Sequence, residues 1–191
     1  MAQCNYYRAS VNPFFLKWVA DQQKSENFEA NFSEFPGIEN GNSEINLDSL
    51  ASSLENNNFF DSLVFYNIPR KDMFSSLSII FRSNKKILKF VASKLGNSSK
   101  IGELGKALAS NINHQLVILD LSYNSISYND FFFFIDMLDK YNHNLPILNL
   151  ANCDLNNKSI AELFTSFQRN YGMSMTIEHL LLDGSNFGVP G

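Results

Sequence analysis

The segment LVILDLSYNSI at residues 116–126 has a pattern of apolar positions that predicts a short strand followed by a tight turn. Side chains of a strand alternate between its two faces, and the pattern places Leu116, Leu119 and Leu121 toward one core. Asn124 stands at the ninth position, where its amide can hydrogen-bond the backbone of the turn. The segment therefore predicts a strand with one buried face that ends in a polar turn.

The same pattern, L-x-x-L-x-L-x-x-N/C-x-L, recurs along the chain, as expected of a repeat protein. LPILNLANCDL at residues 145–155 begins 29 residues later (145 − 116 = 29) and has Cys153 in place of the asparagine. IEHLLLDGSNF at residues 177–187 has Ser185 there. These three copies predict successive strands of one sheet.

Two weaker copies precede these three. FDSLVFYNIPR from Phe60 and ILKFVASKLGN from Ile87 keep the first three apolar positions. They have Ile68 and Leu95 in place of the asparagine. We therefore expect the first two turns to be less regular than the later ones.

Segments between the strand patterns have the periodicity of a helix. Apolar residues recur at i, i+3 and i+7, so one stripe of each helix faces the core. The five segments span 45–57, 72–84, 100–111, 129–142 and 158–170. Their first core position advances by 27, 27, 30 and 29 residues (positions 47, 74, 101, 131, 160). Each segment ends in asparagine, which tolerates a left-handed C-terminal cap, and we expect such caps there.

The segment NDFFFFIDMLDKYN at residues 129–142 contains four consecutive phenylalanines, and two of them fall in the core columns of the aligned helices. Phe132 lies in the column of Gly102 and Ala161, so we expect it to fill the space beside these small residues. Phe133 lies in a column of Ser and Glu. We therefore expect Phe133 to be exposed and to be a candidate contact on the helical side.

Repeats of 27–30 residues that alternate strand and helix are typical of ribonuclease-inhibitor-like leucine-rich repeats. We predict an α/β solenoid with a parallel sheet on its concave side and α-helices on its convex side. Residues 1–45 would form a helical N-terminal cap. Residues 46–191 would form about five leucine-rich repeats.

The two ends of the predicted solenoid differ. NPFFLKWVADQQ at residues 12–23 predicts an amphipathic helix that covers the first core layer, followed by a degenerate strand around Ala30. At the other end the chain stops just after a strand. An uncovered last repeat would expose Ile177, Leu180 and Leu182. We therefore expect the chain to be a truncated piece of a longer solenoid.

Composition and motifs argue against several functions. The net charge of −4 disfavours nucleic acid or an anionic membrane as the main partner, and two cysteines give no disulfide framework. His114, His143 and His179 lack a carboxylate or cysteine at useful spacing, so we expect exposed loop histidines. No phosphate-binding loop or nucleophile motif occurs. We predict no enzyme, no catalytic residue, no metal and no cofactor.

The concave face carries the candidate site. Strand parity places Ile118 beside Ile147, and an apolar patch with a polar rim is typical of a protein-binding surface. A flanking segment of the protein could cover the patch instead. The predicted protein-binding residues are Ile118, Asp120, Tyr123, Ile147, Asn149, His179 and Leu181, with Val64 and Val91 nearby.

From NLDSLASSLENNNFFDSLVFYN through SSLSIIFRSNKKI, LGKALASN, LVILDLSYNSI and LPILNLANCDL, the chain resembles the leucine-rich repeat domain of CARMIL-type actin-regulatory scaffolds. The resemblance covers roughly residues 12–187. It implies a scaffold of the cytoplasm and cell cortex that regulates actin capping protein and class I myosins. The family's capping motif, dimerisation segment and membrane-binding domain lie outside its repeats, so only the scaffold role carries over.

Three functions remain open at this point. The first is a non-enzymatic scaffold that binds a cytoskeletal or small-GTPase signalling protein on its concave face. The second is a leucine-rich repeat GTPase activator, and the third is a repeat module of a Rho-signalling protein. Membrane contact would come only through domains outside this chain.

Overall fold

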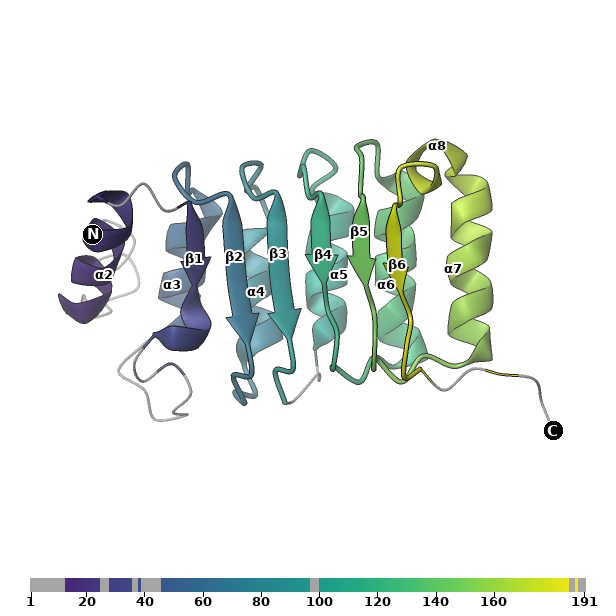
Figure 1. The fold of residues 1–191 in the computed structure, drawn as a ribbon, viewed down its shortest axis with the longest axis horizontal. Helices are drawn as coiled ribbons and strands as arrows, with labels where there is room; N and C mark the ends of the chain where they lie inside the picture. Colours follow the sequence, from purple (N-terminus) through teal and green to yellow (C-terminus); the bar gives the residue numbers. More distant parts are fainter. Residues whose placement is uncertain are drawn as a thin grey trace.

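The computed structural model describes residues 13–24, 28–35, 38, 46–96, 100–185 and 188. Within these residues the chain forms a parallel sheet whose strands follow one another in sequence order (Figure 1). The strands are β1 (Glu29–Asn31), β2 (Ser62–Tyr66), β3 (Lys89–Ser93), β4 (Ile118–Asp120), β5 (Ile147–Asn149) and β6 (His179–Leu181). The predicted α/β class with a parallel sheet is confirmed.

Helices connect the strands and cover one face of the sheet (Figure 1). This layer consists of α3 (Leu47–Glu55), α4 (Met73–Ile80), α5 (Ile101–Ser110), α6 (Tyr128–Lys140) and α7 (Asn157–Arg169). In addition, α2 (Pro13–Lys24) precedes β1, the 3-10 helix η1 (Phe32–Glu34) follows β1, and the short α8 (Tyr171–Ser174) follows α7. Successive parallel strands require such crossovers. No helix in the described part of the chain is both long and apolar enough to cross a membrane.

The strand register matches the sequence alignment. The third position of each pattern forms one row across the sheet, and the fifth position forms the next. The rows extend to β1, where Glu29 pairs with Ser62 and Asn31 with Val64. We call the sheet face without helices the open face (Figure 1).

The turns after the strands share one backbone conformation. The eighth position has a positive φ of 55–68° after each of β2–β6, at Asn67, Lys94, Tyr123, Asn152 and Gly184. The expectation of irregular first turns is therefore wrong, and β2 and β3 are also longer than β4 and β5. Apolar side chains replace the asparagine in these turns without changing the turn, because they are buried in the core.

Asn124 acts as predicted. Its Oδ1 accepts from the Leu95 amide at 3.0 Å, and its Nδ2 donates to the carbonyls of Ala92 and Leu121, each at 2.7 Å. Cys153 takes the same place in the next unit and donates from Sγ to the Leu121 carbonyl at 3.2 Å. Burial raises the pKa of the Cys153 thiol to about 12, so this cysteine is an inert core residue.

The predicted core columns of the helices are buried in α3–α6. Phe65 and Phe90 complete this core from the strands, and the Phe81 ring contacts Phe90 edge-on at 4.8 Å. Burying a large apolar side chain contributes about 1.5–3 kcal/mol, so these columns are the main source of stability. The buried members of the first two columns are Leu47, Phe74, Ile101 and Phe131, and Leu50, Leu77, Leu104, Phe134 and Leu163.

The predicted register fails at the other two phenylalanines of α6. Phe132, expected beside Gly102 and Ala161, is 53% exposed. Phe133, expected in solvent, is half-buried against α5. A Cβ added to Gly105 would lie 2.9 Å from the Phe133 Cβ, and one added to Gly102 would lie 3.1 Å from its ring. The two glycines let α6 approach α5, and this approach covers Phe133.

Of these two phenylalanines, the exposed one is therefore Phe132. The Phe133 ring is further covered by Lys106, whose ammonium lies 4.2 Å from the ring centroid. The side chain of Phe133, predicted as a candidate contact, is thus half-buried within the helical layer. The side chain that a partner could reach is that of Phe132.

The asparagines at the helix ends do not form left-handed caps, because none of these five residues has a positive φ. Three of them form a ladder between units instead. Asn84 donates from Nδ2 to the carbonyls of Leu54 at 2.8 Å and Asn57 at 3.3 Å, and Asn111 donates to the Asn84 carbonyl at 2.9 Å. We call Asn57, Asn84 and Asn111 the asparagine ladder.

Tyr141, rather than Asn142, takes the next place in this series. Asn170 donates to the Tyr141 carbonyl at 2.7 Å, just as Asn111 donates to Asn84, whereas Asn142 is exposed. The Tyr141 hydroxyl reaches inward and donates to the Leu116 carbonyl at 2.6 Å. Burial raises the pKa of this hydroxyl, so it stays a donor at neutral pH.

Helix α2 covers the start of the sheet, as predicted for the N-terminal cap (Figure 1). Its Trp18 ring lies 5.4 Å from Phe32 and 6.0 Å from Phe60 between ring centroids. Ala30 in β1 is buried, which confirms the degenerate first strand. At the opposite end, Ile177, Leu180 and Leu182 are half-buried.

Candidate functional site: the open face of the sheet

The open face presents two rows of side chains in register. The first row reads Glu29, Ser62, Lys89, Ile118, Ile147 and His179 from β1 to β6. The second row reads Asn31, Val64, Val91, Asp120, Asn149 and Leu181. Apolar and polar residues exchange rows between β3 and β4 and again between β5 and β6. The apolar path therefore shifts from the second row to the first at β4 and β5 and returns to the second row at β6.

Ile118 and Ile147 form the centre of this path. They are directly paired across β4 and β5, and both are half-buried although no helix lies above them. Val91 precedes them on β3 and Leu181 follows on β6, both also half-buried. The predicted apolar patch is thus assembled on one face.

Asp120 and Asn149 form the adjoining polar pair. The Asn149 Nδ2 donates to Asp120 Oδ2 at 2.9 Å. Ser122 donates to Asp120 Oδ1 from its amide at 2.9 Å and from its hydroxyl at 2.6 Å. Three hydrogen bonds therefore fix the carboxylate beside the isoleucines.

The other end of the open face is neutralised internally. The Glu29 Oε2 accepts from the Lys89 ammonium at 2.7 Å and from the Ser62 hydroxyl at 2.8 Å. The hydrogen bond from Lys89 holds the pKa of Glu29 below its usual value. Sequence reasoning missed this cluster because Glu29 precedes the first recognised copy of the motif.

Two predicted site residues lie at the margin. Tyr123 stands in the turn after β4, where it is 58% exposed, and His179 is exposed on the edge strand β6. Tyr123 therefore borders the patch at the end of the strands and does not lie within it. The remaining predicted residues occupy adjacent positions on β4, β5 and β6.

Sequence reasoning also missed a third apolar row. Leu88, Val117 and Pro146 stand at the second position of the motif, just before the strands, and are half-buried. Leu88 and Val117 line a shallow depression together with polar loop residues that include His143. The second position could have been read from the same alignment, because its members in three successive units are all apolar.

His114 corrects the expectation of exposed loop histidines. Its side chain is buried and stacks on Tyr141, with ring centroids 4.7 Å apart, and Tyr141 in turn contacts His143 at 5.7 Å. The His114 Nδ1 has no hydrogen-bond partner within the described residues. Burial and, second, the nearby His143 lower the pKa of His114 to about 4, so it is neutral at pH 7.

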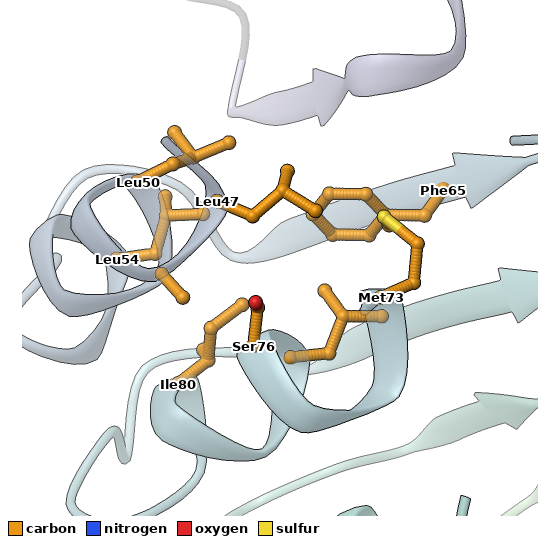
Figure 2. Close-up of a pocket in the computed structure, with 9 residues that line it drawn as sticks. Leu47, Leu50, Leu54, Phe65, Met73, Ser76 and Ile80 are labelled. Carbon is orange, nitrogen blue, oxygen red and sulfur yellow. The ribbon is translucent and has the colours of Figure 1, made fainter. Parts of the chain in front are cut away.

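A small cavity lies between α3, α4 and β2 (Figure 2). Leu50, Met73 and Phe65 line it, and Ser76 provides a hydroxyl, which donates to Asp48 at 2.6 Å. The volume of the cavity is about 10 Å³, close to the minimum for one water molecule. The cavity is a packing gap and is too small for a ligand.

Within the described residues, no group of three histidines, cysteines or carboxylates is arranged to hold a metal ion. Comparisons with known proteins add no assignment, since neither a protein-family model nor a curated protein sequence matches this chain. The open face is therefore characterised by its own residues: a continuous apolar path, a fixed carboxylate at Asp120 and an ion pair between Lys89 and Glu29.

Proposed function

We propose that this chain is a non-enzymatic, protein-binding module built of leucine-rich repeats, and that its open face is the binding surface. The proposal of leucine-rich repeats is supported by the recurring strand pattern and by the recurring positive φ at the eighth position. The parallel strand order and the asparagine hydrogen bonds agree with it.

One observation carries the assignment to the open face. Ile118 and Ile147 pair side by side at the centre of a sheet face that none of the described helices covers. Exposed parallel strands that serve only as a scaffold would carry polar residues there, because apolar surface in water is costly. A partner that buries this path would recover that free energy.

The resemblance to CARMIL-type repeats supports a partner among cytoskeletal or small-GTPase signalling proteins. On the same basis we propose that the protein works as a scaffold in the cytoplasm, near the cell cortex. Any membrane contact in this proposal comes from outside the repeats, because the net charge of −4 disfavours binding to anionic lipid.

A comparative pull-down tests the proposal. The 191-residue chain is immobilised and incubated with cytoplasmic extract, beside a variant with Ile118→Ala and Ile147→Ala. We expect the wild-type chain to retain cytoskeletal or signalling proteins that the double variant loses. The matched control carries Phe132→Ala and Phe164→Ala, which remove exposed apolar side chains from the helical side and should leave the retained proteins unchanged.

Thermal unfolding of each variant separates lost binding from lost folding. Half-buried isoleucines contribute less to the core than buried ones, so the double variant should remain folded. Retention that depends on Phe132 and Phe164, and is indifferent to the isoleucines, would assign binding to the helical side and refute the open face.

A further inference from the structure

Negative charge is unbalanced in one half of the open face. Carboxylates stand on β4–β6 or at their ends at Asp120, Glu178 and Asp183, and the last two are exposed. Within residues 116–124, 145–153 and 177–185, all described by the structure, there is no lysine or arginine. In the β1–β3 half, Glu29 is neutralised by Lys89, and the exposed Lys94 balances the charge of Asp61, which stands just before β2.

Asp120 is positioned to receive a cation. Its three hydrogen bonds from Ser122 and Asn149 hold the carboxylate in place and occupy three of its roughly four acceptor positions. One acceptor position remains on Oδ2, and no lysine, arginine or histidine forms an ion pair with Asp120 in the described part of the chain. The carboxylate is half-buried and lies next to Ile118 on the same strand.

The distance between the apolar and anionic groups suits one kind of side chain. Ile118 and Asp120 are two residues apart on β4, which corresponds to about 7 Å along the strand. Lysine and arginine have an apolar stem of this length and a charged head, and they pack the stem on apolar surface while the head reaches a polar group. The isoleucine pair and the carboxylate thus form a matched site.

We propose that the C-terminal half of the open face recognises a basic side chain, lysine or arginine, within an apolar segment of a partner protein. The stem of that side chain packs on Ile118 and Ile147, and its charged head binds Asp120. This inference rests on the proposed protein-binding function and specifies the chemistry of the partner.

The same geometry rejects other partners. A purely apolar segment would bury the Asp120 charge without a counter-ion, which is unfavourable in a low-dielectric interface. An acidic segment would face Asp120, Glu178 and Asp183 together. Specificity for a basic segment therefore arises from repulsion of the alternatives as well as from attraction.

Selection from a library of short random peptides tests this inference on the full chain. Peptides are selected in parallel on the wild-type chain, on the Asp120→Asn variant, and on the variant with Ile118→Ala and Ile147→Ala. We expect wild-type selections to be enriched in lysine or arginine beside aliphatic residues. Asp120→Asn should abolish the basic enrichment, and the isoleucine variant should abolish selection altogether.

Affinity of the best wild-type peptide gives the quantitative check. Fluorescence anisotropy should show a Kd about tenfold higher with Asp120→Asn, and a smaller dependence on salt, because the contact is an ion pair. The matched control is Glu162→Gln, which removes a carboxylate from the helical layer and should leave the Kd unchanged. If Asp120→Asn fails to fold, Glu178→Gln with Asp183→Asn should raise the Kd two- to threefold.

The outcomes separate this inference from the proposed function. If the selected peptides bind the wild type but not the variant with Ile118→Ala and Ile147→Ala, and carry no lysine or arginine, the inference is overturned and the proposed function stands. Basic peptides whose affinity ignores both Asp120→Asn and the paired Glu178→Gln and Asp183→Asn would also overturn it. Absence of selection, or selection indifferent to the isoleucines, would overturn both.

Discussion

The early and late units of the sheet differ in where polar side chains bridge them. Between β1 and β4, side-chain amides bridge the units at the helix ends, through the asparagine ladder, while the turns after β2 and β3 contain apolar side chains. From β4 onward, Asn124 and Cys153 also bridge the units at the turns after the strands, and at the helix ends Asn170 donates to the carbonyl of Tyr141. The turns lie at the lower edge in Figure 1 and the helix ends at the upper edge.

This difference shows that a polar side chain can hydrogen-bond the backbone of the neighbouring unit as well as that of its own unit. The Leu95 side chain cannot hydrogen-bond the backbone of its own turn. Its backbone amide is nevertheless paired, because Oδ1 of Asn124 in the next unit accepts from it. A buried amide or carbonyl without a partner costs about 1–3 kcal/mol, so one asparagine that serves two turns relaxes the sequence requirement on its neighbour. The predictions below test this arrangement.

Asn124→Ala is expected to have the largest effect. The side chain is 2% exposed and bonds Leu95, Ala92 and Leu121, so its removal leaves several buried backbone groups without partners. We expect a loss of about 4 kcal/mol in the free energy of unfolding, measured by urea denaturation. Asn113→Ala, an exposed asparagine, is the matched control and should change stability by less than about 0.5 kcal/mol. A loss below about 1 kcal/mol for Asn124→Ala would refute the shared bridge.

Acid should destabilise the late units through His114. Its pKa is about 4 in the folded protein and 6.5 in the unfolded chain. Below pH 6.5 the unfolded chain therefore binds more protons, and stability is lost as pH falls toward 4. The difference corresponds to about 3 kcal/mol.

The His114→Phe variant isolates this contribution. Phenylalanine can retain the stack on Tyr141 but does not titrate, so the variant should lose less stability than the wild type between pH 6.5 and 4. Asn113→Ala, at an exposed residue next to His114 that does not titrate, should follow the wild-type pH profile. Urea denaturation across this pH range measures both, and identical slopes for His114→Phe and wild type would contradict the assignment.

Asn84→Ala tests the ladder of the early units. It removes hydrogen bonds to Leu54 and Asn57 and from the amides of Lys86 and Ile87. We expect a loss of about 2 kcal/mol, smaller than for Asn124, because the site borders an open depression from which water can replace part of the bonding.

The control for this prediction is Asn142→Ala. The sequence alignment places Asn142 in the ladder, whereas the structure places Tyr141 there and leaves Asn142 exposed. We expect a change below about 0.5 kcal/mol in urea denaturation. Equal losses for Asn84→Ala and Asn142→Ala would show that the aligned position, and not the hydrogen bonding, determines stability.

Gly105→Ala should give the smallest effect and lies where the early and late units meet. Alanine gains about 1 kcal/mol of helix propensity, but its Cβ would lie 2.9 Å from the Phe133 Cβ and 3.2 Å from backbone atoms of α6. Overpacking costs about 1–3 kcal/mol, so we expect a net loss of about 1 kcal/mol in thermal or urea unfolding. Gly172→Ala in α8 meets no atom within 4 Å and should be stabilising. Stabilisation by Gly105→Ala would mean that α5 and α6 do not depend on this close approach.

The repeating elements were predictable because they depend on local periodicity. The strand pattern at Leu116, Leu119 and Leu121 and the i, i+3, i+7 stripes of the helices each follow from one burial direction per element. The open-face pair of Ile118 and Ile147 followed from strand parity, and so did the position of Asp120. Alignment of such patterns gave the strand order and the register without any knowledge of distances.

Lateral contacts between helices were not predictable in the same way. A column alignment does not distinguish the two sides of α6 that flank the core stripe. For this reason the predicted exposures of Phe132 and Phe133 were the reverse of the observed ones. Their exposure depends on how closely α5 approaches, and that approach depends on Gly102 and Gly105 of a different helix. Likewise, Tyr141 and Asn142 are adjacent in sequence, and only the position of the Asn170 donor shows which of them belongs to the ladder.

The sequence by itself determined which residues face the core and which face the open side of the sheet, because the strand and helix periods fix these directions within each element. The tertiary structure decided the distances between elements: the α5–α6 approach, the burial of His114 beside Tyr141, and the fixed Asp120 carboxylate next to the isoleucines. These depend on side chains 25–30 residues apart in the chain, whose separation no local period specifies.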